Sequence, residues 1–105
     1  MHDRTGKNPW RGDDGRATVA VASCTDYTTE RVDGAVRQVV RLLGGLDRFV
    51  TPGTRVLLKP NLNGVEGCTD RELSEALLRM LLDLGAGKVF FAESTFGDAK
   101  MTDMF

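Results

Sequence analysis

Three short segments of the chain have the apolar pattern of buried β-strands. Residues 17–23 read Ala-Thr-Val-Ala-Val-Ala-Ser, residues 55–59 read Arg-Val-Leu-Leu-Lys, and residues 88–92 read Lys-Val-Phe-Phe-Ala. In each segment apolar side chains fall on both alternating faces, which is typical of strands that are covered on two sides. Pro60 ends the second segment because proline lacks the amide that a ladder requires. The pattern therefore predicts three strands.

Two further segments have the three-and-four spacing of amphipathic helices. The first stripe runs from Val32 to Leu43. Gly44-Gly45 follow it and can adopt the left-handed backbone conformation that ends a helix. The second stripe runs from Leu73 to Leu84. It follows residues 69–72, Thr-Asp-Arg-Glu, whose form predicts a capping box. Both helices connect one predicted strand to the next.

The alternation of strands and helices determines the predicted fold class. Helical crossovers join parallel strands through right-handed connections. The sequence therefore predicts an α/β fold of two or three layers in β-α-β-α-β order, with a three-stranded parallel sheet, which is half of a doubly wound, Rossmann-like sheet. The strand order stays open between 2-1-3 and sequential.

The two ends of the chain differ from this middle part. Residues 1–16 are polar and rich in charge and glycine, which predicts a disordered tail, although Trp10 could dock on a neighbouring surface. Residues 17–105 form the predicted α/β domain. Its last residues begin an apolar helical pattern that ends at Phe105. We therefore expect an incomplete domain, truncated at its carboxyl end, whose uncovered sheet self-associates or binds a partner subunit.

Charge and cysteine content exclude several classes of function. The 105 residues hold 14 basic and 15 acidic side chains, a net charge of -1, so we expect no nucleic-acid partner. No apolar run approaches the roughly 20 residues of a membrane span, and we expect a cytoplasmic protein without a membrane partner. The chain has only two cysteines, Cys24 and Cys68, and one histidine. These residues cannot form a disulfide framework or a zinc or iron–sulfur site.

The carboxyl ends of the predicted strands carry polar side chains. In open parallel sheets these ends point towards one crevice, where ligands bind. The ligand-binding candidates at these ends are Lys59, Asn61, Cys24, Asp26, Glu93 and Ser94. They predict a site for a small anionic ligand.

Each of these candidates also has a structural interpretation. Lys59 can pair with an anion or act as a base, or it can form an ordinary bridge to Glu93 or Asp26. Glu93 can act as a general base or hold magnesium, or it can pair with Lys59. Asn61 can bind a ligand or stabilise its own loop. Cys24 lacks a histidine that would activate it, which favours a small buried thiol.

The segment Val56-Leu57-Leu58-Lys59-Pro60-Asn61-Leu62 resembles the amino-terminal part of the family called domain of unknown function 362. Weaker matches are residues 24–27, 42–46, 49–53, 84–86 and 93–94. The resemblance implies a βαβ domain in which Lys59, Asn61 and Glu93 face a site, within a redox-associated family that is often linked to iron–sulfur segments. Members of that family are longer, and their clustered cysteines are absent here. We therefore expect no iron–sulfur cluster in this chain itself, and its cofactor stays open.

Two functions follow from these residues. In the first, the chain is part of a small-molecule or anion-binding, redox-associated protein, with Lys59 and Glu93 as the candidates if it is an enzyme. In the second, it is a non-catalytic interaction or scaffold module that completes its sheet with a partner subunit. The polar strand ends favour the first function, and the second is the alternative.

Overall fold

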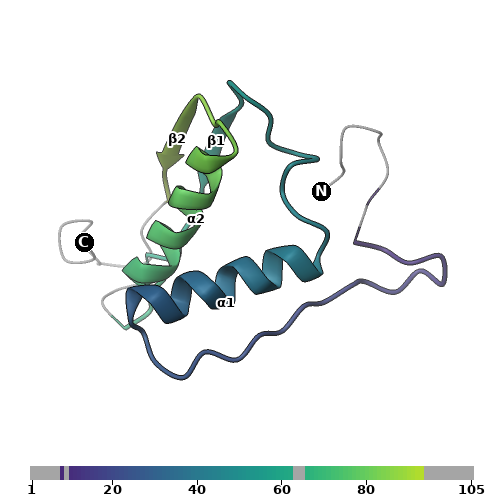
Figure 1. Cartoon of the computed structure of the whole chain (residues 1–105), viewed down its shortest axis with the longest axis horizontal. Helices are drawn as coiled ribbons and strands as arrows, with labels where there is room; N and C mark the ends of the chain where they lie inside the picture. The colour runs from purple at the N-terminus through teal and green to yellow at the C-terminus, as the bar shows by residue number, and fades with distance from the viewer. Residues whose placement is uncertain (1–7, 9, 63–65, 94–105) are drawn as a thin grey trace.

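The computed structural model describes residue 8 and residues 10–62 and 66–93 of the chain. Two helices and two strands alternate along this part: α1 (Thr29–Leu42), β1 (Arg55–Leu58), α2 (Arg71–Asp83) and β2 (Lys88–Phe91) (Figure 1). The strands pair in parallel, with Arg55 beside Lys88 and Leu58 beside Phe91. The predicted α/β class and the parallel pairing of these two segments are confirmed.

The third strand, predicted at residues 17–23, is wrong for this structure. The segment follows the length of α1, away from β1 and β2 (Figure 1). An antiparallel bridge between Arg11 and Ala17 joins its start to the amino-terminal turn instead of to the sheet. Val19 and Val21 are consequently 79% and 82% exposed. The sheet in the described residues therefore has two strands, because an alternating pattern does not specify which strand edge a segment pairs with.

The core lies between the two helices. Val32 and Val36 of α1 are buried against Ala76 and Met80 of α2. These residues belong to the two predicted apolar stripes, so the predicted helical faces are confirmed. Neither helix of the described part is long and apolar enough to span a bilayer.

Neither helix of the described part begins with a side-chain capping bond from its N-cap residue. Thr28 is the N-cap of α1, and the Asp26 carboxylate accepts hydrogen bonds from the Thr28 amide at 3.0 Å and from its hydroxyl at 2.7 Å. The predicted capping box at residues 69–72 is wrong, because Asp70 is the N-cap of α2 and makes no side-chain capping bond. The Thr69 hydroxyl accepts a hydrogen bond from the Asn61 amide instead.

Tight turns bring the amino ends of the strands together. The Thr54 amide donates to the Thr51 carbonyl at 3.0 Å, and Gly53 between them has φ +87°, as a type II turn requires. The Gly53 amide donates to the Gly85 carbonyl at 2.8 Å, and the Gly87 amide donates to the Thr54 carbonyl at 2.9 Å. These two bonds join the loop before β1 to the loop before β2.

Trp10 docks on the body of the protein. Its ring lies 5.0 Å from the Phe49 ring between centroids, and its indole N–H donates to the Leu43 carbonyl at 3.3 Å. The polar segment before residue 17 thus has one anchored residue in the described part. An aromatic ring with a satisfied N–H explains this anchoring.

A network of ion pairs crosses the outer side of the helix pair. Asp33 of α1 accepts hydrogen bonds from Arg37 at 2.8 Å and from Arg79 of α2 at 3.3 Å. Arg37 also donates to Asp83 of α2 at 3.3 Å. The hydrogen bond from Arg37 is the main cause that holds the pKa of Asp33 below its ordinary value of 3.8, while burial acts in the opposite direction.

This network predicts a loss of stability in acid. Because the pKa of Asp33 is lower in the folded than in the unfolded chain, its contribution is present above pH 4 or so and disappears as the pH falls through the folded pKa. Asp33→Asn should lower the free energy of unfolding at pH 7 by about 1 kcal/mol. It should also flatten the stability profile below about pH 4. Urea denaturation at several pH values measures both effects.

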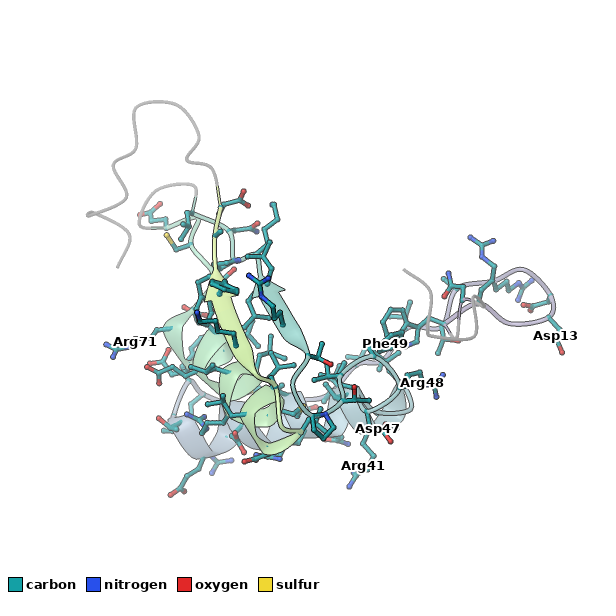
Figure 2. The ribbon with its side chains drawn as sticks, turned by 90° about the horizontal axis from the view of Figure 1, so that it is seen from above. Asp13, Arg41, Asp47, Arg48, Phe49 and Arg71 are labelled. Carbon is teal, nitrogen blue, oxygen red and sulfur yellow. The ribbon has the colours of Figure 1, made fainter. Side chains whose placement is uncertain are left out.

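The matched control for Asp33 is Asp47. Asp47 is exposed and makes no ion pair within the described part of the chain (Figure 2). Asp47→Asn should leave the pH profile of stability unchanged. An unchanged profile for Asp33→Asn would show that the network does not contribute to stability.

Candidate functional site

Lys59 and Glu93 meet at the carboxyl ends of the two strands. Each residue follows its strand by one or two positions, and the Lys59 ammonium donates a hydrogen bond to the Glu93 carboxylate. The lysine side chain is 66% exposed, whereas the glutamate side chain is only 11% exposed. An ammonium has three donors. The shielded carboxylate therefore holds the ammonium in place while other donors of Lys59 face solvent.

The loop after Lys59 is closed by two hydrogen bonds between Asn61 and Thr69. The Asn61 amide donates to the Thr69 hydroxyl at 2.9 Å, and the Thr69 amide donates to the Asn61 carbonyl at 2.9 Å. Leu62, which bridges to Cys68, is 3% exposed. These contacts fix the position of Asn61 two residues after Lys59, where it is exposed at the same end of the sheet.

Two adjoining hollows open beside these strand ends. The smaller has a volume of about 110 Å³ and includes Lys59 in its lining. The larger has a volume of about 560 Å³, which is in the range of small-molecule sites. Both hollows contain Pro60, Thr69 and Ser74, so we treat them together as the rim hollow. The other residues of its larger part are Leu62, Arg71, Glu75, Leu78 and Phe91.

The rim hollow combines an apolar floor with charged edges. Leu62, Leu78 and Phe91 supply apolar surface. Arg71, which extends outward from α2, donates to Glu75 at 2.7 Å, and this hydrogen bond is the main cause that raises the pKa of Arg71 (Figure 2). The guanidinium is therefore positively charged at any physiological pH. Such a site can hold a molecule with an apolar part and an anionic group.

Phe91 shows that this end of the sheet is incompletely filled. It alternates with Phe90 and lies on the same face as Val89, the face that packs towards α2. It is nevertheless 41% exposed, whereas Val89 is half-buried. A ring that lies on the covered face and remains this accessible is exposed because the hollow lies beside it.

The structure places two other predicted site residues near the start of α1. The Asp26 carboxylate bonds to Thr28 and lies 3.2 Å from the Arg31 guanidinium. The Cys24 thiol donates to the Asp26 carbonyl at 3.0 Å and is exposed, so the predicted buried thiol is wrong. No contact joins Cys24 or Asp26 to Lys59 in the described part of the chain. The predicted Ser94 lies outside the described residues.

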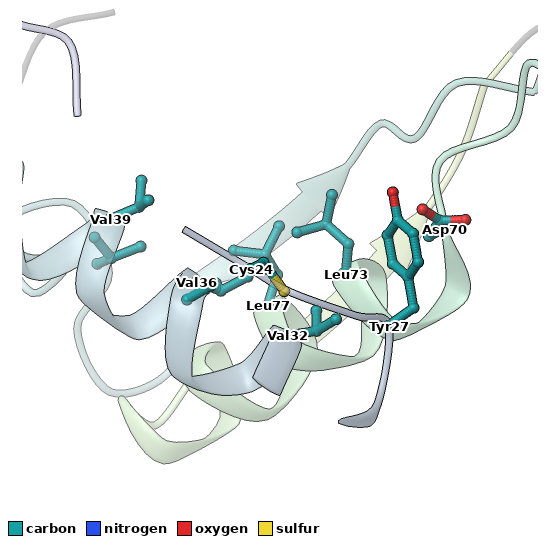
Figure 3. Close-up of a pocket in the computed structure, with 10 residues that line it drawn as sticks. Cys24, Tyr27, Val32, Val36, Val39, Asp70, Leu73 and Leu77 are labelled. Carbon is teal, nitrogen blue, oxygen red and sulfur yellow. The ribbon is translucent and has the colours of Figure 1, made fainter. Parts of the chain in front are cut away.

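Cys24 lines a separate apolar groove. This groove of about 460 Å³ lies between α1 and the amino-terminal half of α2, with Tyr27 and Asp70 at one end and Val36 and Leu77 along it (Figure 3). Most of the side chains that line it are aliphatic. We therefore consider the groove apart from the polar strand ends.

Sequence reasoning missed the α2 side of the rim hollow. Residues 71, 74, 75 and 78 are spaced as one face of a helix, and this spacing was the available signal. The face has mixed polarity, which normally indicates a solvated surface. Among the described residues no group of three histidine, cysteine or acidic side chains could hold a metal ion.

Comparison with known proteins gives a distant similarity. The chain is 35% identical over 89 residues to the thylakoid-associated protein sll1697 of Synechocystis sp., an alignment that covers 79% of this chain and 27% of that protein. The chain thus spans about a quarter of the length of this relative. No family model matches the chain. No solved structure matches it either.

Proposed function

We propose that the rim hollow binds a small molecule that has an anionic group, a phosphate or a carboxylate, and an apolar part. The observation that carries the proposal is the placement of Lys59 and Glu93 next to a hollow of ligand size at the carboxyl ends of parallel strands. Ligands of open parallel sheets bind at these ends. The resemblance of the Lys-Pro-Asn segment to the family called domain of unknown function 362 implies a site that faces Lys59, Asn61 and Glu93.

Lys59 provides the contact for the anionic group. The ion pair with Glu93 restrains the long lysine side chain, so binding costs less side-chain entropy than it would for a mobile lysine. Asn61, exposed beside Lys59, offers a further amide donor. Glu93 lowers the affinity for very highly charged anions, because its carboxylate repels them. A ligand with one phosphate or carboxylate group therefore fits best.

The apolar part of the ligand would cover Phe91. This ring, together with Leu62 and Leu78, lines the larger part of the rim hollow. Covering apolar surface contributes about 25 cal/mol for each Å² that is removed from water. The proposal concerns binding and not a reaction, because Lys59 and Glu93 form an ion pair with each other.

Binding of octyl phosphate to the full chain tests this proposal. Calorimetric titration, below the concentration at which octyl phosphate forms micelles, should give a measurable affinity. Lys59→Gln should weaken it about tenfold, because a charge-assisted hydrogen bond is lost. The same substitution should change the free energy of unfolding by less than about 1 kcal/mol, since the lysine is exposed. Octanoate and octanol separate the contributions of phosphate, carboxylate and apolar chain.

Lys88→Gln is the matched control for Lys59→Gln. Lys88 is also an exposed lysine of the sheet, but it lies at the opposite end of the strands. The Lys88→Gln variant should bind octyl phosphate with the affinity of the unchanged chain. Equal losses of affinity in both variants would show that only the overall charge matters and would reject a site at Lys59.

The location of the chain is also a proposal. The sequence favours a cytoplasmic protein, whereas the name of the relative from Synechocystis describes a protein associated with thylakoids. We propose a cytoplasmic location. Recovery of the tagged full chain in the membrane fraction of its own cells, at low and at high salt, would contradict it.

A further inference from the structure

No helix or strand of the described residues covers one face of the two-stranded sheet. The side chains of this face are exposed. They alternate along the strands with the half-buried Val56, Leu58 and Val89 of the opposite face. We call this surface the open face, and it consists of Arg55, Leu57, Lys88 and Phe90. Leu57 is 62% exposed and Phe90 is 39% exposed. Two large apolar side chains thus lie side by side in water, since Leu57 and Phe90 are register partners.

The open face also places two positive charges opposite each other. Arg55 is the register partner of Lys88. The Arg55 guanidinium lies 5.4 Å from the centre of the Phe90 ring and the Lys88 ammonium lies 5.8 Å from it. Neither forms an ion pair with a carboxylate anywhere in the described part of the chain. Like charges directly opposite in a sheet are destabilising. A carboxylate placed above them would remove this repulsion.

We propose that the open face docks an amphipathic α-helix of a partner protein, whose apolar stripe covers Leu57 and Phe90 and whose acidic side chains contact Arg55 and Lys88. A helix is the expected occupant because parallel sheets are covered by helices on both faces, and α2 covers only the other face. The charge of the open face selects a helix with acidic edges. The inference is independent of the rim hollow, which lies on the α2 side.

A second copy of this chain fits the open face less well. Two open faces placed against each other would bring two more cations to the contact and no carboxylate. The cost of such a like-charged contact opposes the gain from burying Leu57 and Phe90. An anionic lipid surface would also contact the two cations. Only Leu57 and Phe90 would enter it, however, so the apolar contribution to membrane binding is small.

Two synthetic helical peptides test this inference with the full chain. They share one leucine stripe and differ in having glutamate or lysine along its edges. We expect the full chain to bind the glutamate peptide about tenfold more tightly than the lysine peptide, as measured by fluorescence anisotropy of the labelled peptides. Arg55→Glu combined with Lys88→Glu should reverse this preference. Leu57→Ser should weaken the binding of both peptides.

Arg41→Glu combined with Arg48→Glu is the matched control. Both arginines are exposed and lie outside the sheet (Figure 2), and the double change alters the net charge by the same amount. This variant should keep the preference for the glutamate peptide. Circular dichroism verifies that each variant has the helix content of the unchanged chain.

Several results would overturn the inference. The first is equal affinity for the two peptides, or no binding of either. Another is a self-association, seen in sedimentation, that Leu57→Ser abolishes, because it would assign the open face to a second copy. Binding to vesicles of phosphatidylcholine and phosphatidylglycerol that is lost in the Arg55 and Lys88 double variant, without peptide binding, would assign the face to a lipid surface.

Discussion

Replacing Leu81 by alanine should lower the free energy of unfolding by about 2–4 kcal/mol, because a buried leucine loses its packing and leaves a cavity. Leu81 is 3% exposed on α2. The loss is large for a small domain, whose total stability lies near the lower end of about 5–15 kcal/mol. Thermal melting and urea denaturation should both show it.

The adjacent Leu82 supplies the control for this prediction. It belongs to the same helix but is 54% exposed, so Leu82→Ala should lower the stability by less than about 1 kcal/mol. The helix propensities of the two variants are the same, since both replace leucine by alanine in α2. Equal losses in the two variants would contradict the assigned orientation of α2.

Gly87→Ala should lower the free energy of unfolding by about 1–3 kcal/mol, because the added methyl group meets backbone that has no room for it. A Cβ atom at residue 87 would lie 2.7 Å from the Gly53 carbonyl oxygen and 3.1 Å from the Gly53 Cα. Neither atom can rotate away. The two loops before β1 and β2 would have to separate, which weakens the hydrogen bond from Gly87 to Thr54.

Gly34→Ala is the matched change with the opposite expected sign. Gly34 is exposed inside α1, and a Cβ atom there has no neighbour within 4 Å. Alanine has the higher helix propensity, so this variant should gain about 0.5–1 kcal/mol. Thermal melting of both variants distinguishes close packing at residue 87 from a general effect of glycine replacement. A Gly87→Ala variant as stable as the unchanged chain would disprove the close approach to Gly53.

The features that sequence predicted well are local ones. Helical spacing identified both buried stripes, including Val36 and Met80, because the face of a helix follows from the positions of its apolar residues. The type II turn around Gly53 is local in the same sense, because proline fixes φ at its first central position and glycine allows the positive φ at its second. Such features require no knowledge of distant partners.

The features that sequence missed depend on contacts made outside the predicted element itself. The alternation in residues 17–23 is compatible with a strand, but it does not provide a neighbouring edge, and the bridge between Arg11 and Ala17 directs the segment elsewhere. Thr69 has the residue type of a capping box, yet its hydroxyl contacts Asn61 across a loop. In both cases a contact with a neighbouring loop residue takes the place of the predicted one.

The candidate site likewise has one part that the sequence predicted and one part that it did not. The pairing of Lys59 with Glu93 was one of the predicted alternatives for these residues, because parallel strands bring their carboxyl ends together. The hollow beside them depends on the position of α2 relative to Phe91, which no local pattern specifies. The proposal that these side chains bind a ligand can be measured directly.

That measurement is a map of octyl phosphate binding on the full chain by nuclear magnetic resonance of its backbone amides. We predict the largest shifts at Lys59, Asn61, Thr69 and Ser74, and their loss in Lys59→Gln. Shifts confined to the apolar groove beside Cys24 and Tyr27 (Figure 3), or shifts that persist unchanged in Lys59→Gln, would contradict a ligand site at the carboxyl ends of β1 and β2.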